Sequence, residues 1–355
     1  MKAIDRNIEK ISSVSLSVVA LGVILAILVI GKSFLVPLAI AILIWHLLEA
    51  LINDFGRFTI GRFRLPRWFA TVLAIGLILV ILYTTTIVLL GQADAIANAW
   101  PRYVARMKSI VSGLADWFGQ GPSAKIREEM GKFDFTKPAA DVFTSAQSLV
   151  VNIGLVFLYV AFLFGERRYI NDKLGGLFTD AKVARDTQQM LSAISSGIRR
   201  YIWLKSLMSV MTGVLSYAVL RAVGVDFAET WALLIFLLYY IPIVGPVVGV
   251  VFPALITWVQ FYTIESVLGV ACGLTAIYAI VGNAVEPMLM RKSLNLSAFA
   301  IVLSLTFWGT IWGVVGMFLS VPIMVVTMII CANVPGWRWA SILLSKDGRI
   351  SDGRG

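Results

Sequence analysis

The sequence predicts an all-α polytopic membrane protein with six to eight transmembrane helices. Of its 355 residues, 59% are hydrophobic and 14% are charged, whereas a soluble domain carries roughly a quarter charged residues. The mean hydropathy is +0.87. The apolar residues gather in runs of about 20, the length at which a helix crosses a ~30 Å hydrocarbon core. Such a chain cannot cover itself with polar surface, so lipid must be its solvent.

The first 91 residues, 1–91, hold three predicted spans, at 11–30, 34–52 and 68–91. The first apolar run follows three basic residues and is longer than the apolar core of a signal peptide. No small-residue cleavage site follows it. We therefore expect this run to be retained as a membrane span.

Two polar regions flank a fourth predicted span at 146–165. In the region 92–145, which we place outside the cytoplasm, apolar residues recur at helical spacing, so part of it is predicted to be an amphipathic helix. The region 166–204, which we place in the cytoplasm, holds a second amphipathic helix capped near Thr179 or Asp180. Helices of this kind commonly lie flat between lipid and water.

The part 205–335 alternates two uninterrupted spans with two long apolar segments that glycine and proline interrupt. In chain order these are the span 205–224, the broken segment 230–260, the span 264–285 and the broken segment 298–330. A polar tail at 336–355 follows them, and we expect it in the cytoplasm.

Simple lengths favour a fold-back in each broken segment. As one helix, segment 230–260 would be about 46 Å long, with a proline near its middle. A break at 243–245 leaves halves of roughly 20 Å, too short to cross alone. The same reasoning places a break near 310–313 in segment 298–330. We therefore expect two re-entrant hairpins, with kinked crossing helices as the alternative. The expected turn residues are Pro242, Gly245 and Pro246 in the first segment and Gly309, Gly313 and Gly316 in the second.

The distribution of basic residues places both chain termini in the cytoplasm. With both broken segments re-entrant, most of the 30 Lys and Arg residues fall on that side, and threading both segments across moves only Arg291 and Lys292 outside. The hairpins would bring their tips towards the bilayer midplane from opposite faces. Broken backbone at that depth needs cover from protein or a wet cavity. Paired broken segments indicate a transporter binding site, although two kinked helices without a ligand are the alternative.

Polar side chains at membrane depth are candidates for binding, because an unpaired charge in lipid is costly. Asn283 and Glu286 lie three residues apart on one predicted helix face, and Pro287 frees carbonyl groups nearby. The pair could bind a cation, a proton or a hydroxylated solute. The alternative is an interfacial Glu286 paired with Arg291 or Lys292.

Other polar residues have plainer interpretations beside their functional ones. Ser304 and Thr306 approach the second break, where they face a solute or satisfy local backbone. His46 and Glu49, near the end of the second span, are expected to be hydrogen-bonded residues of the interface rather than a proton relay. Lys205 is expected to extend its ammonium to the cytoplasmic headgroups.

The composition also bears on classes of function that we do not expect. The net charge of +10 is scattered among loops, a pattern typical of topology signals and anionic lipid contact rather than of nucleic-acid binding. Cys272 and Cys331 are isolated in apolar segments, so neither a disulfide framework nor a metal site is expected. The sequence holds no HExxH, GxSxG or P-loop motif and a single histidine. We therefore expect no enzyme, no cofactor and no ATP-driven pumping by this chain.

Two motifs resemble a known family of bacterial membrane proteins. They are IPIVGPVVGVVFPALI at 241–256 and NAVEPMLMRKSLNLSAFAIVLSLTFWGTIWGVVGMFLSVPIMV at 283–325. Together with the layout of the whole chain they are similar to the autoinducer-2 exporter family, also described as PerM-like permeases, and within it to the branch containing the enterobacterial autoinducer-2 transport protein. The chain departs from many members at Arg291-Lys292, where they carry Gly-Lys, and at Ser297-Ala298, where they carry His-Pro.

The resemblance implies a bacterial inner-membrane permease that exports autoinducer-2, a small hydroxylated quorum-sensing signal, and that assembles as a homo-oligomer. From the residues we expect alternating access at a midplane site between the broken segments, with Asn283 and Glu286 holding a small polar solute, a coupling cation or a proton. The alternatives are a sodium or lithium/proton antiporter of the same family and a membrane scaffold that transports nothing.

Overall fold

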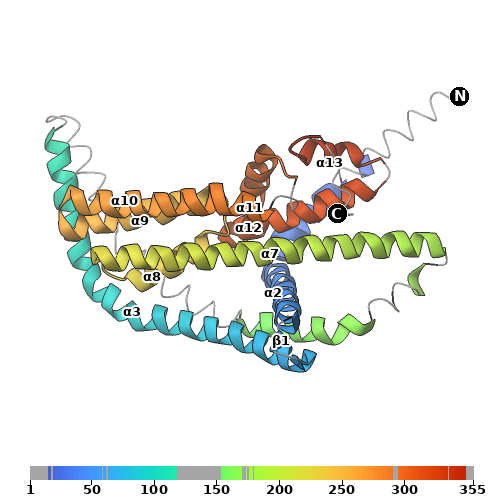
Figure 1. The fold of residues 1–355 in the computed structure, drawn as a ribbon. Coiled ribbons are helices and arrows are strands. Elements are labelled where there is room, and N and C mark those ends of the chain that lie inside the picture. Colours follow the sequence, from blue (N-terminus) through green and yellow to red (C-terminus); the bar gives the residue numbers. More distant parts are fainter. Residues whose placement is uncertain are drawn as a thin grey trace, which may run out of the picture. The chain divides into compact units, whose positions relative to one another are not determined.

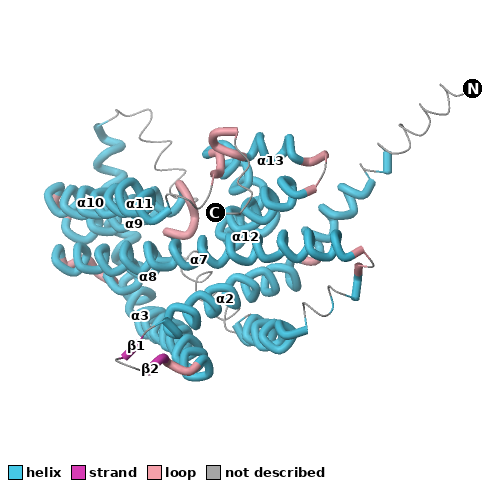
Figure 2. Tube along the Cα trace, turned by 45° about the vertical axis from the view of Figure 1, so that its right-hand side comes forward, coloured by secondary structure: helices cyan, strands magenta, loops and turns pink. Residues whose placement is uncertain are grey.

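The computed structural model describes residues 15–16, 19–57, 59–60, 63–117, 153–169, 173, 176–178, 180–290, 295–334 and 336–348. These residues are almost entirely helical (Figure 2). The main elements are α2 (Lys32–Arg57), β1 (Thr59–Ile60), β2 (Phe63–Arg64), α3 (Arg67–Trp117), η1 (Arg167–Tyr169), α7 (Ala181–Val223), α8 (Ala228–Leu238), α9 (Val244–Phe261), α10 (Ile264–Ala279), η2 (Ile280–Val285), α11 (Glu286–Met290), α12 (Ala298–Asn333) and α13 (Arg338–Leu344). Shorter apolar helices cover Val19–Ile30 and Ile153–Glu166.

The predicted class of fold, a helical protein of several membrane spans, is confirmed. Within the described residues, six helices are long and apolar enough to cross a membrane. They are Lys32–Arg57, Arg67–Val88, Ala181–Val223, Val244–Phe261, Ile264–Leu289 and Ala298–Asn333. Large hydrophobic side chains such as Val80, Val214 and Leu303 are more than half exposed on these helices, as expected where lipid is the solvent.

Two of these helices are much longer than a bilayer needs. Helix α3 has 51 residues, about 77 Å at 1.5 Å per residue, so only its apolar first part fits a ~30 Å core. It continues through residue 91 without a break, as α7 does through residue 204. The short antiparallel ribbon of β1 and β2, which the sequence analysis did not anticipate, joins α2 to α3. The remainder of the region 92–145 beyond Trp117, together with 146–152, lies outside the described residues.

The chain divides into two compact units, and each is described by itself. The first comprises 1–45, 153–194 and 295–354, and the second comprises essentially 46–152 and 195–294. The core of the second unit joins α7, α8 and α10 through fully buried side chains that include Met208, Ile235 and Leu274. In the same unit α9 and α10 run side by side (Figure 1).

In the second unit, α8 and α9 form a helical hairpin. The backbone N–H of Asp226, before α8, donates to Oε1 of Gln260, at the end of α9, at 2.8 Å. Nε2 of Gln260 in turn donates to the Gly224 carbonyl oxygen at 2.9 Å. Because the start of α8 and the end of α9 meet, the chain between them must reverse direction. The break predicted in segment 230–260 is therefore a fold-back.

The ends of this hairpin are held by the second half of α3. The Tyr103 hydroxyl donates to Oδ2 of Asp226 at 2.5 Å, and Arg106 donates to the carbonyl oxygen of Gln260 at 3.2 Å. Burial, and then the hydrogen bond to Asp226, raises the pKa of Tyr103, so this residue remains a donor at neutral pH. Gln92 donates to Oε2 of Glu229 at 2.9 Å. Both feet of the hairpin are thereby tied to α3.

In the first unit, α12 also folds back on itself. Gly313 has φ 63° and ψ −142°, a conformation that glycine alone adopts readily. Ser304 and Ser320 would lie about 24 Å apart in a straight helix, yet the Ser304 hydroxyl donates to the Ser320 carbonyl oxygen at 3.0 Å. A Cβ on Gly316 would lie 1.9 Å from the Trp308 carbonyl oxygen. The break predicted near 310–313 is therefore a second helical hairpin.

Candidate functional site

The candidate site of the second unit begins at a widened turn of helix. Residues Ile280–Val285 form a π-helix between α10 and α11, closed by the Glu286 N–H donating to the carbonyl oxygen of Val281. Pro287 explains the distortion, because it has no N–H and its ring clashes with the preceding turn of a regular α-helix. Short π-helical turns frequently occur at functional sites. Here the turn places the Glu286 carboxylate against α7 and the tip of the α8–α9 hairpin.

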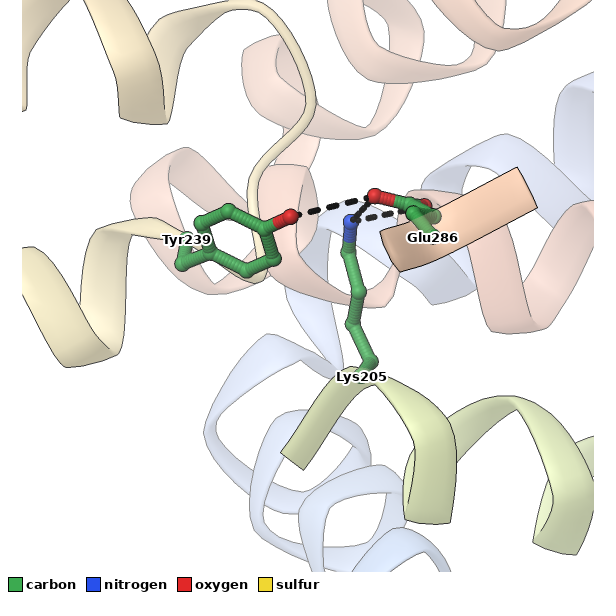
Figure 3. Close-up of polar contacts among 3 residues, drawn as sticks. All are labelled: Lys205, Tyr239 and Glu286. Carbon is green, nitrogen blue, oxygen red and sulfur yellow. Dashed lines mark hydrogen bonds and ion pairs between the residues drawn. The ribbon is translucent and has the colours of Figure 1, made fainter. Parts of the chain in front are cut away.

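Glu286 forms an ion pair with Lys205 of α7 (Figure 3). The Lys205 Nζ lies 3.2 Å from Oε1 and 3.4 Å from Oε2 of the carboxylate. The side chain of Lys205 is 8% exposed and that of Glu286 is 27% exposed. Neither charge could remain unpaired at this depth without a large desolvation penalty. The pair therefore keeps two ionised groups inside a helical, apolar unit.

Tyr239 connects this ion pair to the hairpin. Its hydroxyl donates to Oε2 of Glu286 at 3.2 Å, and its ring lies 4.5 Å from Nζ of Lys205, which is within cation–π distance (Figure 3). Tyr239 directly follows α8, in the turn between the two hairpin arms. A change in the charge of Glu286 would therefore alter the strength of the hydrogen bond that holds the hairpin tip.

The backbone of the tip is strained and closely packed. Ile243 has φ 64° and ψ −54°, and the Val244 N–H donates to the Pro242 carbonyl oxygen at 2.6 Å. These values describe a three-residue γ-turn of the rare strained kind, which is unusual for a β-branched residue. A Cβ on Gly245 would lie 2.1 Å from the Leu238 carbonyl oxygen, so this position requires glycine.

Tyr278 of α10 supports the tip from the other side. Its ring stacks on that of Tyr239 with centroids 5.9 Å apart, and its hydroxyl donates to the Gly245 carbonyl oxygen at 3.3 Å. A Cβ on Gly249 would lie 2.1 Å from that hydroxyl oxygen, so the glycine makes room for the tyrosine. The arrangement fixes the Tyr239 ring and with it the hydroxyl that reaches Glu286.

The predicted residues of this region have different surroundings. The partners of Glu286 in the described part of the chain are Lys205 and Tyr239, while Asn283 is exposed on the π-helix. Pro242 and Gly245 lie in the tip, and Pro246 lies in the first turn of α9, where the missing N–H of a proline does no harm. Arg291 and Lys292, the alternative partners of Glu286, lie outside the described residues.

In the first unit, Ser304 and Thr306 bond to backbone. Ser304 is buried and reaches the Ser320 carbonyl oxygen, and Thr306 donates to the carbonyl oxygen of Val302 at 3.0 Å. Gly309 faces Met317 across the fold of α12, and Gly313 and Gly316 form its turn. Both hydroxyls thus bond to backbone carbonyl oxygens, Thr306 within its own helix turn and Ser304 across the fold of α12.

One of the plainer interpretations, that for Lys205, needs revision. Lys205 does not extend to the headgroups, because it is buried against Glu286, whose attraction outweighs the gain from hydration at the interface. His46 and Glu49 are both 4% exposed, and the Glu49 Oε2 lies 3.6 Å from Arg199 of α7. They belong to a charged contact between α2 and α7. In the described ranges no group of three His, Cys, Asp or Glu is placed to hold a metal ion.

The sequence analysis found Glu286 but missed Lys205 and Tyr239 as its partners. A lone lysine inside an apolar run was the available signal, since the same cost that singled out Glu286 applies to its ammonium. Tyr239 carried no comparable signal, because only the reversal at the tip brings it to the carboxylate.

These features define a multi-pass helical membrane protein with two folded-back segments and a charged pair within its helices. The chain belongs to the AI-2E family of transporters, whose family model matches residues 16–336. It is 29% identical over 329 residues to a putative transport protein of Haemophilus influenzae, covering 90% of this chain and 92% of the relative. It is 28% identical over 339 residues to the AI-2 transport protein TqsA of Escherichia coli, covering 92% of this chain and 95% of TqsA. A putative transport protein of Borreliella burgdorferi is 33% identical over 218 residues, 61% of this chain and 59% of the relative.

Proposed function

We propose that this transporter exports autoinducer-2 or a related small polar solute across the bacterial inner membrane, and that Glu286 couples export to proton movement. The substrate class is supported by the AI-2 transport protein TqsA, whose similarity covers 92% of this chain. The coupling role is supported by one observation, the Lys205–Glu286–Tyr239 cluster at the hairpin tip. The outward direction of transport and the homo-oligomer are supported by the family resemblance. The cytoplasmic position of both termini is supported by the distribution of basic residues.

The cluster suggests how protonation acts on the hairpin. A charged Glu286 attracts the Lys205 ammonium and accepts a hydrogen bond from the Tyr239 hydroxyl. A neutral Glu286 loses most of the attraction to Lys205 and weakens the bond to Tyr239, because hydrogen bonds to ionised acceptors are roughly twice as strong. Proton binding therefore releases the tip of the α8–α9 hairpin. In the proposed mechanism this release alternates access to a solute site at the tip of the α8–α9 hairpin, with Asn283 available to a hydroxylated solute.

The substitution Glu286→Gln tests the coupling role, with Glu265→Gln as the matched control. Gln keeps the shape of Glu but cannot change charge, whereas Glu265 is exposed at the start of α10. In reconstituted vesicles Glu286→Gln should lower pH-driven autoinducer-2 transport by about tenfold or more, since a positioned proton acceptor contributes factors of this size. Glu265→Gln should leave it within about twofold of wild type. Gel filtration checks that both variants stay folded.

The outcomes separate the rival functions. Unchanged transport in Glu286→Gln would end the coupling role. Proton flux driven by a sodium or lithium gradient, in vesicles without autoinducer-2, would favour the antiporter instead. Flux of neither kind in the wild type would favour the scaffold.

A further inference from the structure

A line of buried hydroxyl groups runs along α7 from the Glu286 site. Ser209, Thr212 and Ser216 follow Lys205 at spacings of four, three and four residues, so the four share one helix face. Each of the three hydroxyl residues is 0% exposed. The line covers about 17 Å of helix, more than half of a ~30 Å hydrocarbon core.

Two of these hydroxyls lack the partner that such groups normally find. Within the described residues, Oγ1 of Thr212 and Oγ of Ser216 are buried without a hydrogen bond. Other threonines of this chain donate to the carbonyl oxygen four residues earlier, as Thr86, Thr306 and the fully buried Thr257 do. A buried hydroxyl without a partner costs about 1–3 kcal/mol, so two on one face call for an occupant that hydrogen-bonds to them.

Close packing alone does not account for hydroxyls on this face. A Cβ on Gly213 would lie 3.0 Å from Cβ of Phe236 and 3.3 Å from the Ala232 carbonyl oxygen, so α8 covers α7 closely here. Glycine or alanine would permit the same approach without burying a polar group. Small size therefore explains Gly213 but not Thr212 or Ser216.

A polar cluster lies near each end of the line of hydroxyls. At one end the Tyr240 hydroxyl donates to Ser206 at 2.7 Å and lies beside Ser209, one turn from Lys205. At the other end Tyr217, next to Ser216, donates to Oε1 of Glu229 at 3.2 Å. Glu229 is also bonded to Gln92 of α3 and is near Arg221 of α7.

We propose that the α7 face bearing Ser209, Thr212 and Ser216 is a hydrated proton path that connects Glu229 with Glu286. Water on this face satisfies the hydroxyls and completes a chain of hydrogen bonds between the two carboxylates. When a proton enters at Glu229, each water or hydroxyl on the path accepts one proton and donates another, so it is neutral again afterwards. It then forms an O–H bond on Glu286, whose charge falls from −1 to zero. Among the described residues, the groups facing Glu286 are Lys205, Tyr239 and Tyr201. The proposal deepens the coupling role assigned to Glu286 and rests on it.

Thiol labelling tests for water on this face without any transport measurement. In a background of Cys272→Ser and Cys331→Ala, the variants Thr212→Cys and Ser216→Cys should react with a small charged methanethiosulfonate at least about tenfold faster than Thr257→Cys, because the thiolate forms readily only where it is hydrated. Thr257 is an equally buried threonine whose hydroxyl is bonded to its own helix. Equal, slow labelling of all three variants would show a dry face and would overturn the proposal.

Proton flux provides the second test. In vesicles loaded with a pH-sensitive dye, with an imposed membrane potential, the combination of Thr212→Val and Ser216→Ala should lower proton influx by about tenfold, a barrier increase near 1.4 kcal/mol. Solute counterflow at equal pH should persist, and Thr257→Val should lower influx by less than about twofold. Influx unchanged by the double substitution would overturn the path. A wild type that moves no protons would instead refute the coupling role of Glu286, while the labelling result would still decide whether the face is hydrated.

Discussion

At the scale of single residues, the ion pair between Lys205 and Glu286 has unequal consequences for its two partners. Lys205 is nearly enclosed, whereas Glu286 keeps 27% of its side chain exposed. A partly exposed carboxylate can exchange a proton with water. The enclosed ammonium beside it can then change position in response to the new charge of the carboxylate. This asymmetry suits a group that must change charge during a transport cycle rather than a pair that serves stability alone.

Replacing one member of the pair should harm the fold more than replacing both. Lys205→Met leaves the Glu286 carboxylate without its cation and should lower the free energy of unfolding by about 2 kcal/mol, less than for a fully buried pair because Glu286 is partly exposed. Adding Glu286→Gln should recover most of this loss. Chemical unfolding in detergent measures the stability of the wild type, of Lys205→Met, of Glu286→Gln and of the double variant. Equal losses in Lys205→Met and in the double variant would contradict a direct pairing.

How much of the site the sequence could reveal depended on the type of residue. Glu286 stood out because a carboxylate near membrane depth is expensive wherever the chain goes. Its partners could not be inferred, since Lys205 lies 81 positions away and Tyr239 lies 47 positions away. Asn283 was paired with Glu286 on the assumption of regular helical spacing, which the π-helix removes. Hydroxyls without partners are visible only once burial is known.

At the scale of elements, the α8–α9 hairpin combines a fixed base with a strained tip. Its base carries the hydrogen bonds of Gln260, Tyr103 and Arg106, while its tip is held by Tyr239 and Tyr278. Motion of the tip against this base requires fewer bonds to break than withdrawal of the whole hairpin. The hairpin is therefore built to move mainly at its inner end.

Gly245 should be far less tolerant of alanine than a glycine elsewhere in this part of the fold. A Cβ at Gly245 would meet the Leu238 carbonyl oxygen at 2.1 Å, whereas none of the atoms around Gly269 in α10 lies within 4 Å. Because backbone must move to relieve the clash, Gly245→Ala should lower stability by about 2–4 kcal/mol. Gly269→Ala should leave stability unchanged or raise it by about 0.5–1 kcal/mol. Thermal unfolding in detergent compares the two, and similar midpoints would refute the close contact at the tip.

The reversals could be predicted from the sequence for a physical reason. Length and composition favour a fold-back over a straight crossing for the segment 230–260, and glycine and proline at 242–246 supply the turn. The lengths of α3 and α7 could not be predicted in the same way. Nothing in residues 91–92 or 204–205 marks a helix end, and both helices continue there. The ribbon at 59–64 is too short to leave a period-two pattern.

At the scale of the whole molecule, the side of the membrane on which the tail lies depends on the number of complete crossings. Exchanging both hairpins for crossings would leave the tail on the same side, whereas exchanging only one would move it to the other side. If both hairpins re-enter, the spans at 264–285 and earlier determine the side of the tail, and the basic residues place that side in the cytoplasm. The tail itself returns to the start of α12 in the first unit, where the Ser297 N–H donates to the Leu344 carbonyl oxygen at 2.8 Å. The tail and the beginning of α12 must therefore share one side of the membrane.

Reporter fusions test this topology. A green fluorescent protein fused after residue 355 should fluoresce, and alkaline phosphatase fused there should be inactive, because both report a cytoplasmic end. Phosphatase fused after Thr263, between α9 and α10, should be active as a matched control for the opposite side. An active fusion at the tail together with an inactive one at Thr263 would invert the orientation. The same result at both sites, whether active or inactive, would contradict the re-entrant arrangement.

The γ-turn at Ile243 makes the conformation of the hairpin tip dependent on the contacts around it. A β-branched residue held at positive φ carries about 1–3 kcal/mol of backbone strain, and a hydrogen bond to a charged acceptor contributes about 1.5–3 kcal/mol. The two quantities are similar in size, so the bond from Tyr239 to Glu286, together with the support of Tyr278, offsets the strain at Ile243. We therefore propose that neutralising Glu286, on another helix, shifts the balance between the strained shape of this loop and a relaxed one.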